Sequence, residues 1–157
     1  MSKHTSFSHG DKIAIACDHG GYELKGTIID SLKEYQFKII DLGTDTTLSV
    51  DYPDYAQKMS HCIRDKEASG GVIICGTGIG ISIAANRYSF IRAALVHNEF
   101  TAEMARLHNN ANVIALGARV INTQTAINCI NKFFSTQFEG GRHIKRVEKL
   151  GNLNIHS

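Results

Sequence analysis

The chain has 157 residues, of which 43% are apolar and 20% charged, enough for one hydrophobic core and too few for two ordinary domains. Its 17 basic and 15 acidic side chains are spread along the sequence, which argues against general attraction to nucleic acid or to membranes. The start, 1–11, is polar, and no later stretch approaches the roughly 20 apolar residues that span a bilayer. We expect a single cytoplasmic domain over 1–157, with an N-terminal extension at 1–11 and the functional domain at 12–150.

Short β-branched runs alternate with longer segments of helical period, and no internal repeat or linker separates them. The expected strands are 12–17, 38–42, 71–75, 92–96 and 113–116. The expected helices are 21–35, 54–65, 81–86, 99–108 and 123–134, followed by a basic helix after Gly140-Gly141. Asn98 is expected to cap the fourth helix, and Pro53, the single proline, to sit in a loop. Five βα units predict an α/β fold: a doubly wound, five-stranded parallel sheet in a Rossmann-like αβα sandwich, with a C-terminal helical extension.

Four cysteines, Cys17, Cys62, Cys75 and Cys129, lie far apart and form no C-x-x-C pair. This spacing indicates free thiols in a reducing compartment. The sequence has no H-E-x-x-H motif, carboxylate cluster or cysteine–histidine cage, so we expect neither a metal nor another cofactor.

The most informative segment is the end of the third strand, where Cys75 opens into a glycine-rich loop, Gly76-Thr77-Gly78-Ile79-Gly80. Ligands of open α/β folds bind at the carboxyl ends of strands, and the amides of such a loop face negatively charged oxygens. The same amides, with the dipole of the following helix, favour the thiolate of Cys75. A free cysteine on a strand is otherwise most often a small buried apolar residue, as we expect for Cys62 and Cys129.

Polar residues follow other strands as well. Asp18 and His19 end the first strand, and His97 with Asn98 ends the fourth. A topological switch point between the first and third strands would bring Asp18, His19 and Cys75 to one crevice. Asp18 is equally suited to capping the first helix, and His19 to a solvated loop.

Cationic candidates lie in the second half of the chain. His108 ends a helix, where the dipole favours a cation whether or not the residue has a function. Arg142 and Arg146 are one turn apart if helical and suit a phosphate, although a solvated basic face is the alternative. Arg119 is a weaker candidate of the same kind.

Familiar anion-binding motifs fail on spacing. A cysteine phosphatase signature would need arginine at position 81, which is Ile81, and a dinucleotide-binding G-x-G-x-x-G would have to follow the first strand. A Walker loop would need the G-K-[ST] ending. These exclusions leave metal-free acid–base chemistry on a small anionic substrate.

The chain resembles the RpiB/LacAB sugar-phosphate isomerase family, that of type B ribose-5-phosphate isomerases, over about residues 12–150. The matching segments are Cys17-Asp18-His19-Gly20-Gly21, Asp51-Tyr52-Pro53 with Tyr55-Ala56, Ile74 to Ser82 with Ala84-Ala85-Asn86, His108-Asn109 with Asn112-Val113, and Glu139-Gly140-Gly141-Arg142-His143 with Arg146-Val147. One branch of the family uses a glutamate at the position of Ile81, so Cys75 with Ile81 indicates the cysteine branch.

The resemblance implies reversible conversion of ribose 5-phosphate to ribulose 5-phosphate through a cis-enediolate, a reaction of the pentose phosphate pathway. Cys75 would move the proton between C1 and C2, and Thr77 would shuttle hydroxyl protons. The amides of Gly76, Thr77, Gly78, Ile79 and Gly80 would stabilise the enediolate oxygen. His108, helped by Asp18, would open the furanose ring. The implied substrate-binding residues are Asp18, Asn109 for the hydroxyls, and His19, Arg119, Arg142 and Arg146 for the phosphate.

The resemblance further implies a homodimer with shared sites, in which His108, Asn109 and Arg119 come from the partner chain, and leaves open a dimer of dimers. Two alternatives remain. One is isomerisation of allose 6-phosphate or galactose 6-phosphate, and the other is a non-catalytic phosphosugar-binding regulator on the same fold. Cys75 and His108 favour the enzyme over the regulator, because phosphate binding requires neither.

Overall fold

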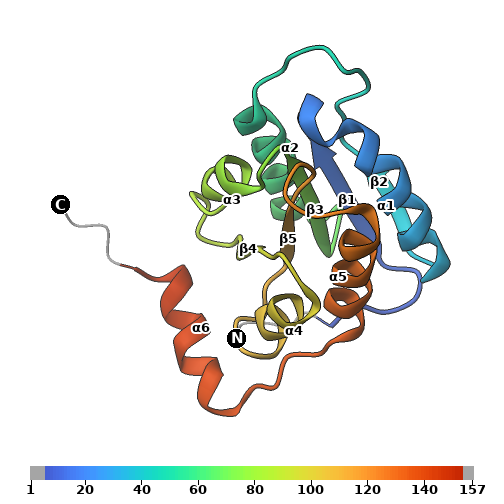
Figure 1. Cartoon of the computed structure of the whole chain (residues 1–157). Coiled ribbons are helices and arrows are strands. Elements are labelled where there is room, and N and C mark those ends of the chain that lie inside the picture. The colour runs from blue at the N-terminus through green and yellow to red at the C-terminus, as the bar shows by residue number, and fades with distance from the viewer. Residues whose placement is uncertain (1–5, 154–157) are drawn as a thin grey trace.

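Five short strands form one parallel sheet in the computed structural model, which describes residues 6–153 (Figure 1). The strands are β1 (Lys12–Cys17), β2 (Lys38–Asp41), β3 (Gly70–Cys75), β4 (Ala93–Leu95) and β5 (Val113–Gly117). Their order is β2-β1-β3-β5-β4, with every neighbouring pair parallel. All residues of β3 and β5 are buried, as expected for parallel strands with both faces covered. The doubly wound α/β fold predicted from the sequence is confirmed.

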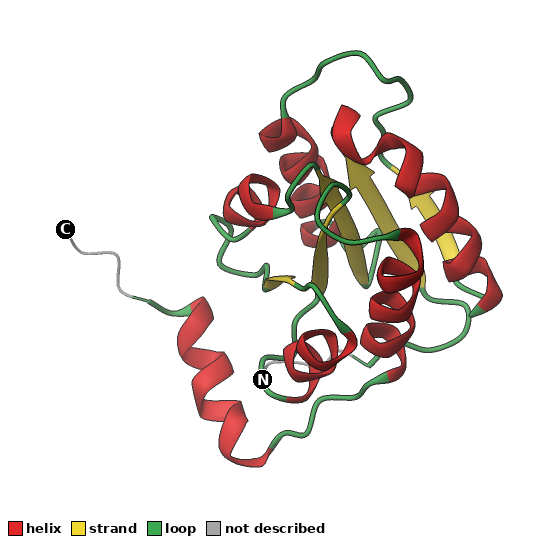
Figure 2. Cartoon of the chain, viewed as in Figure 1, coloured by secondary structure: helices red, strands yellow, loops and turns green. Residues whose placement is uncertain are grey.

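Helices cover both faces of the sheet (Figure 2). α1 (Tyr22–Glu34), α4 (Glu99–Leu107) and α5 (Thr123–Ser135) pack on one face, against strand side chains such as Ile13 and Ile15. α2 (Tyr52–Arg64) and α3 (Ile79–Ala85) pack on the other, against the smaller Ala14 and Ala16. This alternation of large and small residues along β1 follows the two-residue period of a strand and lets α2 approach closely.

Several element boundaries differ from those expected. Pro53 lies in the first turn of α2 rather than in a loop, because the first turn of a helix needs no donor from that position. α3 begins at Ile79 instead of 81, and a short 3-10 turn, η1 (His19–Gly21), precedes α1. The expected cap of α4 is confirmed, since Asn98 Oδ1 accepts the amide of Thr101 at 2.9 Å.

The strand order creates the expected switch point between β1 and β3, because the chain runs from β1 outward to β2 and returns to β3 on the other side. β5 lies between β3 and β4. His97 and Asn98, which follow β4, are therefore two strands away from Cys75.

The chain ends in η2 (Gly141–His143) and α6 (Ile144–Gly151), which Figure 1 shows projecting away from the sandwich. Val147 is the buried residue of α6, whereas Leu150 and Leu153 are exposed. No helix within residues 6–153 is both long and apolar enough to cross a membrane.

Candidate active site

The Cys75 sulfur lies at the carboxyl end of β3, where a backbone amide of the following glycine loop donates to it. Cys75 is 4% exposed, and its Sγ accepts the amide of Gly78 at 3.1 Å. Gly78 has a φ of +75°, and a Cβ there would lie 2.5 Å from Leu95 Cδ1, so glycine is required on both counts. The amide of Ile79 donates to Thr77 Oγ1 at 3.3 Å. Two of the five loop amides are thus used within the loop, one of them on the sulfur.

The loop after β1 closes over the glycine loop. Asp18 is 7% exposed and its Oδ1 accepts the amide of Gly20 at 2.8 Å, so it caps the 3-10 turn η1, whereas the N-cap of α1 is Gly21 and has no side-chain bond. A Cβ on Gly20 would lie 3.0 Å from the amide nitrogen of Gly76. The backbones of the two loops therefore touch, which brings the Asp18 carboxylate to the same crevice as Cys75.

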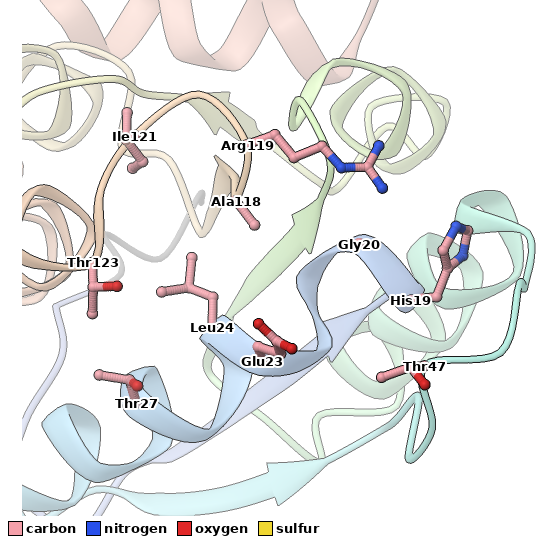
Figure 3. A pocket seen from close by; sticks show the side chains of 10 residues that line it. All are labelled: His19, Gly20, Glu23, Leu24, Thr27, Thr47, Ala118, Arg119, Ile121 and Thr123. Carbon is pink, nitrogen blue, oxygen red and sulfur yellow. The ribbon is translucent and has the colours of Figure 1, made fainter.

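His19 lines a cleft of about 530 Å³ beside these loops, together with Arg119 (Figure 3). The Nδ1 atom of His19 accepts the amide of Val50 at 3.2 Å, which places the imidazole proton on Nε2 in the neutral ring. Cys75 is absent from the cleft lining, but Gly20, which touches Gly76, belongs to it. The cleft thus offers an imidazole and a guanidinium, groups able to bind an anion, next to the glycine loop rather than around the sulfur.

Arg119 lies at this edge of its own chain, whereas the resemblance implied that a partner chain supplies it. β5 is hydrogen-bonded to β3, with Gly117 opposite Cys75, and the amide of Arg119 donates to Gly76 O at 2.9 Å. Its guanidinium crosses Gly76, where a Cβ would lie 2.9 Å from Arg119 Nη1. Strand adjacency, which the motifs do not encode, decides this placement.

The other three cysteines are also free and buried, but their surroundings favour the thiol. Burial raises the pKa of Cys17 and of Cys129 to about 11 and also raises the pKa of Cys62. These groups stay protonated at neutral pH. Cys75 is the candidate base by its position, because it is the one of the four that opens into the glycine loop.

His108 and Asn109 lie at the opposite edge of the sheet. α4 ends at Leu107 and the chain then turns into the start of β5, whereas Cys75 lies level with the end of that strand at Gly117. A five-residue strand spans about 16 Å. One chain therefore cannot bring His108 to its own Cys75.

Arg142 lies with His108 and not with Cys75. The His143 ring stacks on that of His108, with centroids 4.4 Å apart, and Arg142 Nε lies 3.4 Å from His143 Nε2. The Glu139 carboxylate is 3.4 Å from His143 Nε2 and 3.8 Å from His108 Nε2. Arg146 follows on α6 and contributes to a lowered pKa of His143, which results mainly from burial and then from His108 and Arg142.

Three of these groups, His108, Glu139 and His143, have donor atoms within 4.8 Å of one another and could in principle share a cation. The two imidazole planes are only 16° apart, so their in-plane lone pairs run side by side instead of converging on one ion. The nearby Arg142 adds a positive charge. The arrangement suits an anionic group better than a metal.

Other side chains that shape the site received no role from the sequence. Lys25, buried on α1, donates to Asp41 Oδ1 and to Thr44 O, both at 2.8 Å, and so ties down the loop that carries Val50 to His19. The Tyr52 ring lies against Gly80, where a Cβ would be 2.5 Å from its Cζ. The Asp51-Tyr52-Pro53 motif is the sequence feature that could have indicated that Tyr52 shapes the site.

Comparisons with known proteins agree with this geometry. The Ribose/Galactose Isomerase family model matches residues 13–150. A Rickettsia conorii protein provisionally named a sugar phosphate isomerase is 54% identical over 138 residues, which cover 88% of this chain and 96% of the relative. Ribose-5-phosphate isomerase B of Escherichia coli is 42% identical over 139 residues, covering 88% and 93%. A ribose 5-phosphate isomerase structure from Thermotoga maritima superimposes with a TM-score of 0.89 at 46% identity, covering 92% of this chain and all of the other.

The fold and the glycine loop define an α/β isomerase built around a switch-point crevice. The chain belongs to the ribose/galactose isomerase family, and the resemblance drawn from its motifs is confirmed.

Proposed function

We propose that this isomerase interconverts ribose 5-phosphate and ribulose 5-phosphate, with Cys75 as the base. The observation that carries the proposal is the Cys75 sulfur, held against the Gly78 amide at 3.1 Å next to a cleft lined by His19 and Arg119. A base and a phosphate site side by side are what a phosphosugar isomerase needs. The E. coli relative at 42% identity is a ribose-5-phosphate isomerase B, which supports the choice of sugar.

The proton transfer follows from the loop chemistry. The thiolate of Cys75 removes the proton from C2 of the open-chain aldose, and the electron pair forms the C1–C2 double bond of a cis-enediolate. The thiol then returns a proton to C1, while a hydroxyl proton moves from O2 to O1 with the help of Thr77. Loop amides that face the developing oxyanion lower the barrier, an effect that removal of one donor typically reveals as about 10²–10³-fold in kcat.

Ring opening requires a second subunit in this scheme. His108 would protonate the ring oxygen while Asp18, at the Cys75 crevice, assists at the C1 hydroxyl. Since His108 and Cys75 lie at opposite edges of one sheet, we propose a homodimer in which His108, Asn109 and Arg142 of one subunit face Cys75, His19 and Arg119 of the other. Arg146, exposed on α6 one turn beyond η2, would join Arg142 at the phosphate.

The first experiment is ribulose 5-phosphate formation in the presence of a chelator, for the unmodified protein and for Cys75→Ala. Cys62→Ala is the matched control, since Cys62 is also 4% exposed but lies in α2 away from the loop. We expect metal-independent turnover, a loss of about 10²–10⁴-fold in kcat for Cys75→Ala, and near-normal turnover for the control.

Two outcomes would change the proposal. Equal turnover of both cysteine variants would make Cys75 structural. Binding of ribose 5-phosphate without turnover by the unmodified protein would favour a regulator, unless allose 6-phosphate, assayed in parallel, is converted.

A further inference from the structure

The segment ahead of the family match packs under the sheet, at the edge that carries His108. The match begins at residue 13, and residues 6–11 precede it in the structure. The Phe7 ring meets the aromatic side chains of α5, with centroids 4.8 Å from Phe134 and 6.0 Å from Phe133. We infer that Phe7 is a positioning residue for the turn that carries His108 and Asn109, and that it acts through the buried side chain of Arg106. The link to activity rests on the function proposed above for His108.

Phe7 is seated against the backbone of the sheet. A Cβ on Gly70, at the start of β3, would lie 2.6 Å from Phe7 Cε1, so the ring occupies the space that this glycine leaves open. The following residues close a turn, because Asp11 Oδ2 accepts the amide of Ser8 at 2.9 Å and Asp11 donates its own amide to Ser8 O. The amide of Gly10 donates to Gln36 O at 3.0 Å. The segment is therefore anchored to the domain and fixes the ring in place.

The Phe7 ring forms one wall around a buried charge. The Arg106 side chain is fully buried, and its Cζ lies 4.8 Å from the Phe7 ring centroid and 5.5 Å from that of Phe133. Burial, together with the nearby Arg92, lowers the pKa of Arg106 to about 10. A buried guanidinium needs compensating contacts, and aromatic faces provide part of that compensation. Loss of the Phe7 ring would open the guanidinium to water.

The same guanidinium organises the turn after α4. Arg106 Nη1 donates to Asn110 Oδ1 at 3.1 Å and to Ala111 O, and its Nε donates to Thr136 O at 3.3 Å. Asn110 has a φ of +45°, a left-handed conformation that needs local support, and its amide donates to Arg106 O. His108 and Asn109 lie between these points. If the guanidinium became hydrated and shifted, its bonds to Asn110 and Ala111 would break. The turn that carries His108 and Asn109 would then lose both anchors.

The test compares Phe7→Leu with Phe37→Leu in the full chain. Phe37 belongs to the same aromatic cluster, 5.4 Å from Phe134, and makes the matched control because its ring contacts are to Tyr35 and Phe134 rather than Arg106. Amide exchange at Asn110 and Ala111 reports the turn, and exchange at Val72 and Ile114 in the central strands reports global opening. If Phe7→Leu does not fold, Phe7→Met is tested instead, because methionine also removes the ring while keeping a large apolar side chain.

We expect Phe7→Leu to speed exchange at Asn110 and Ala111 by about tenfold relative to the strand amides, and Phe37→Leu to leave that ratio unchanged. We expect kcat for ribose 5-phosphate to fall about three- to tenfold with KM within about twofold, since a displaced acid slows ring opening more than it weakens binding. An unchanged exchange ratio in Phe7→Leu would overturn the inference even in an active isomerase. Because exchange needs no turnover, it decides the role of Phe7 even if the proposed reaction fails.

Discussion

The two edges of the sheet carry the two halves of the candidate site, and they are built in different ways. At the carboxyl edge the backbone shapes the site: glycines at positions 20, 76 and 78 allow close approaches, and the Gly78 amide donates to the Cys75 sulfur. At the amino edge, buried side chains such as Arg106 hold the turn, and His143 supports His108 by stacking. Oxyanion chemistry needs fixed dipoles, whereas in the proposed dimer a group that reaches into another subunit would need a supported but projecting side chain.

The largest expected effect comes from inactivating the carboxyl edge in one chain and the amino edge in another, and then pairing the two chains. Cys75→Ala and His108→Asn should each be nearly inactive alone, because each removes one half from every site. Unfolding them together and refolding should restore about a quarter of the unmodified activity, since random pairing leaves one intact site in each mixed dimer. No recovery on mixing would contradict the shared site, and mass measurement of the mixed dimers provides the control.

The carboxyl edge should be intolerant of a single methyl group. We expect Gly78→Ala to lower the free energy of unfolding by about 1–3 kcal/mol, because alanine at a φ of +75° is strained and its Cβ meets Leu95. Gly26→Ala is the control: Gly26 lies within α1, a Cβ there meets nothing within 4 Å, and helix propensity predicts a gain of up to about 1 kcal/mol. Urea unfolding followed by circular dichroism measures both, and equal effects would contradict the argument.

The loop that positions His19 should depend on Lys25. Lys25→Met removes the bonds to Asp41 and Thr44, and we expect unfolding to become about 1–2 kcal/mol easier, a modest value because Asp41 is 40% exposed. KM should rise as His19 loses its fixed orientation. Lys33→Met, on the exposed side of α1, should change neither quantity. A raised kcat with unchanged KM would contradict a role in positioning His19.

The smallest expected effect concerns acid sensitivity at the amino edge. The pKa of His143 is lowered in the folded protein, mainly by burial and also by His108 and Arg142, with Glu139 opposing. As the pH falls, His143 is therefore protonated in the unfolded state before the folded one. Its contribution to stability is fully present above about pH 6.5 and is lost as the pH falls through the lower native pKa. We expect the melting temperature of the unmodified protein to fall more steeply between pH 7 and 5 than that of His143→Gln. Parallel curves would indicate that other groups dominate.

Features set by residues close together in the sequence could be predicted, whereas features set by contacts between distant residues could not. The strands, the cysteine loop and the Asn98 cap follow from local patterns and were located within a few residues. The position of Arg119 beside Gly76 did not follow from local patterns, because it depends on which strands are neighbours. The stacking of His143 on His108 was missed for a similar reason: the Gly140-Gly141 turn brings together residues 35 positions apart, and no local period signals such a contact.

The hydrogen bond from Val50 to His19 also bears on how freely sugar phosphates leave. With Nδ1 engaged by the Val50 amide, Nε2 is the ring nitrogen left to face a ligand. The phosphate group is the same in aldose and ketose, so contacts to it hold substrate, transition state and product alike and do not speed the chemistry. In the proposed reversible reaction, the His19 contact would therefore hold either sugar phosphate to the same degree and favour neither direction.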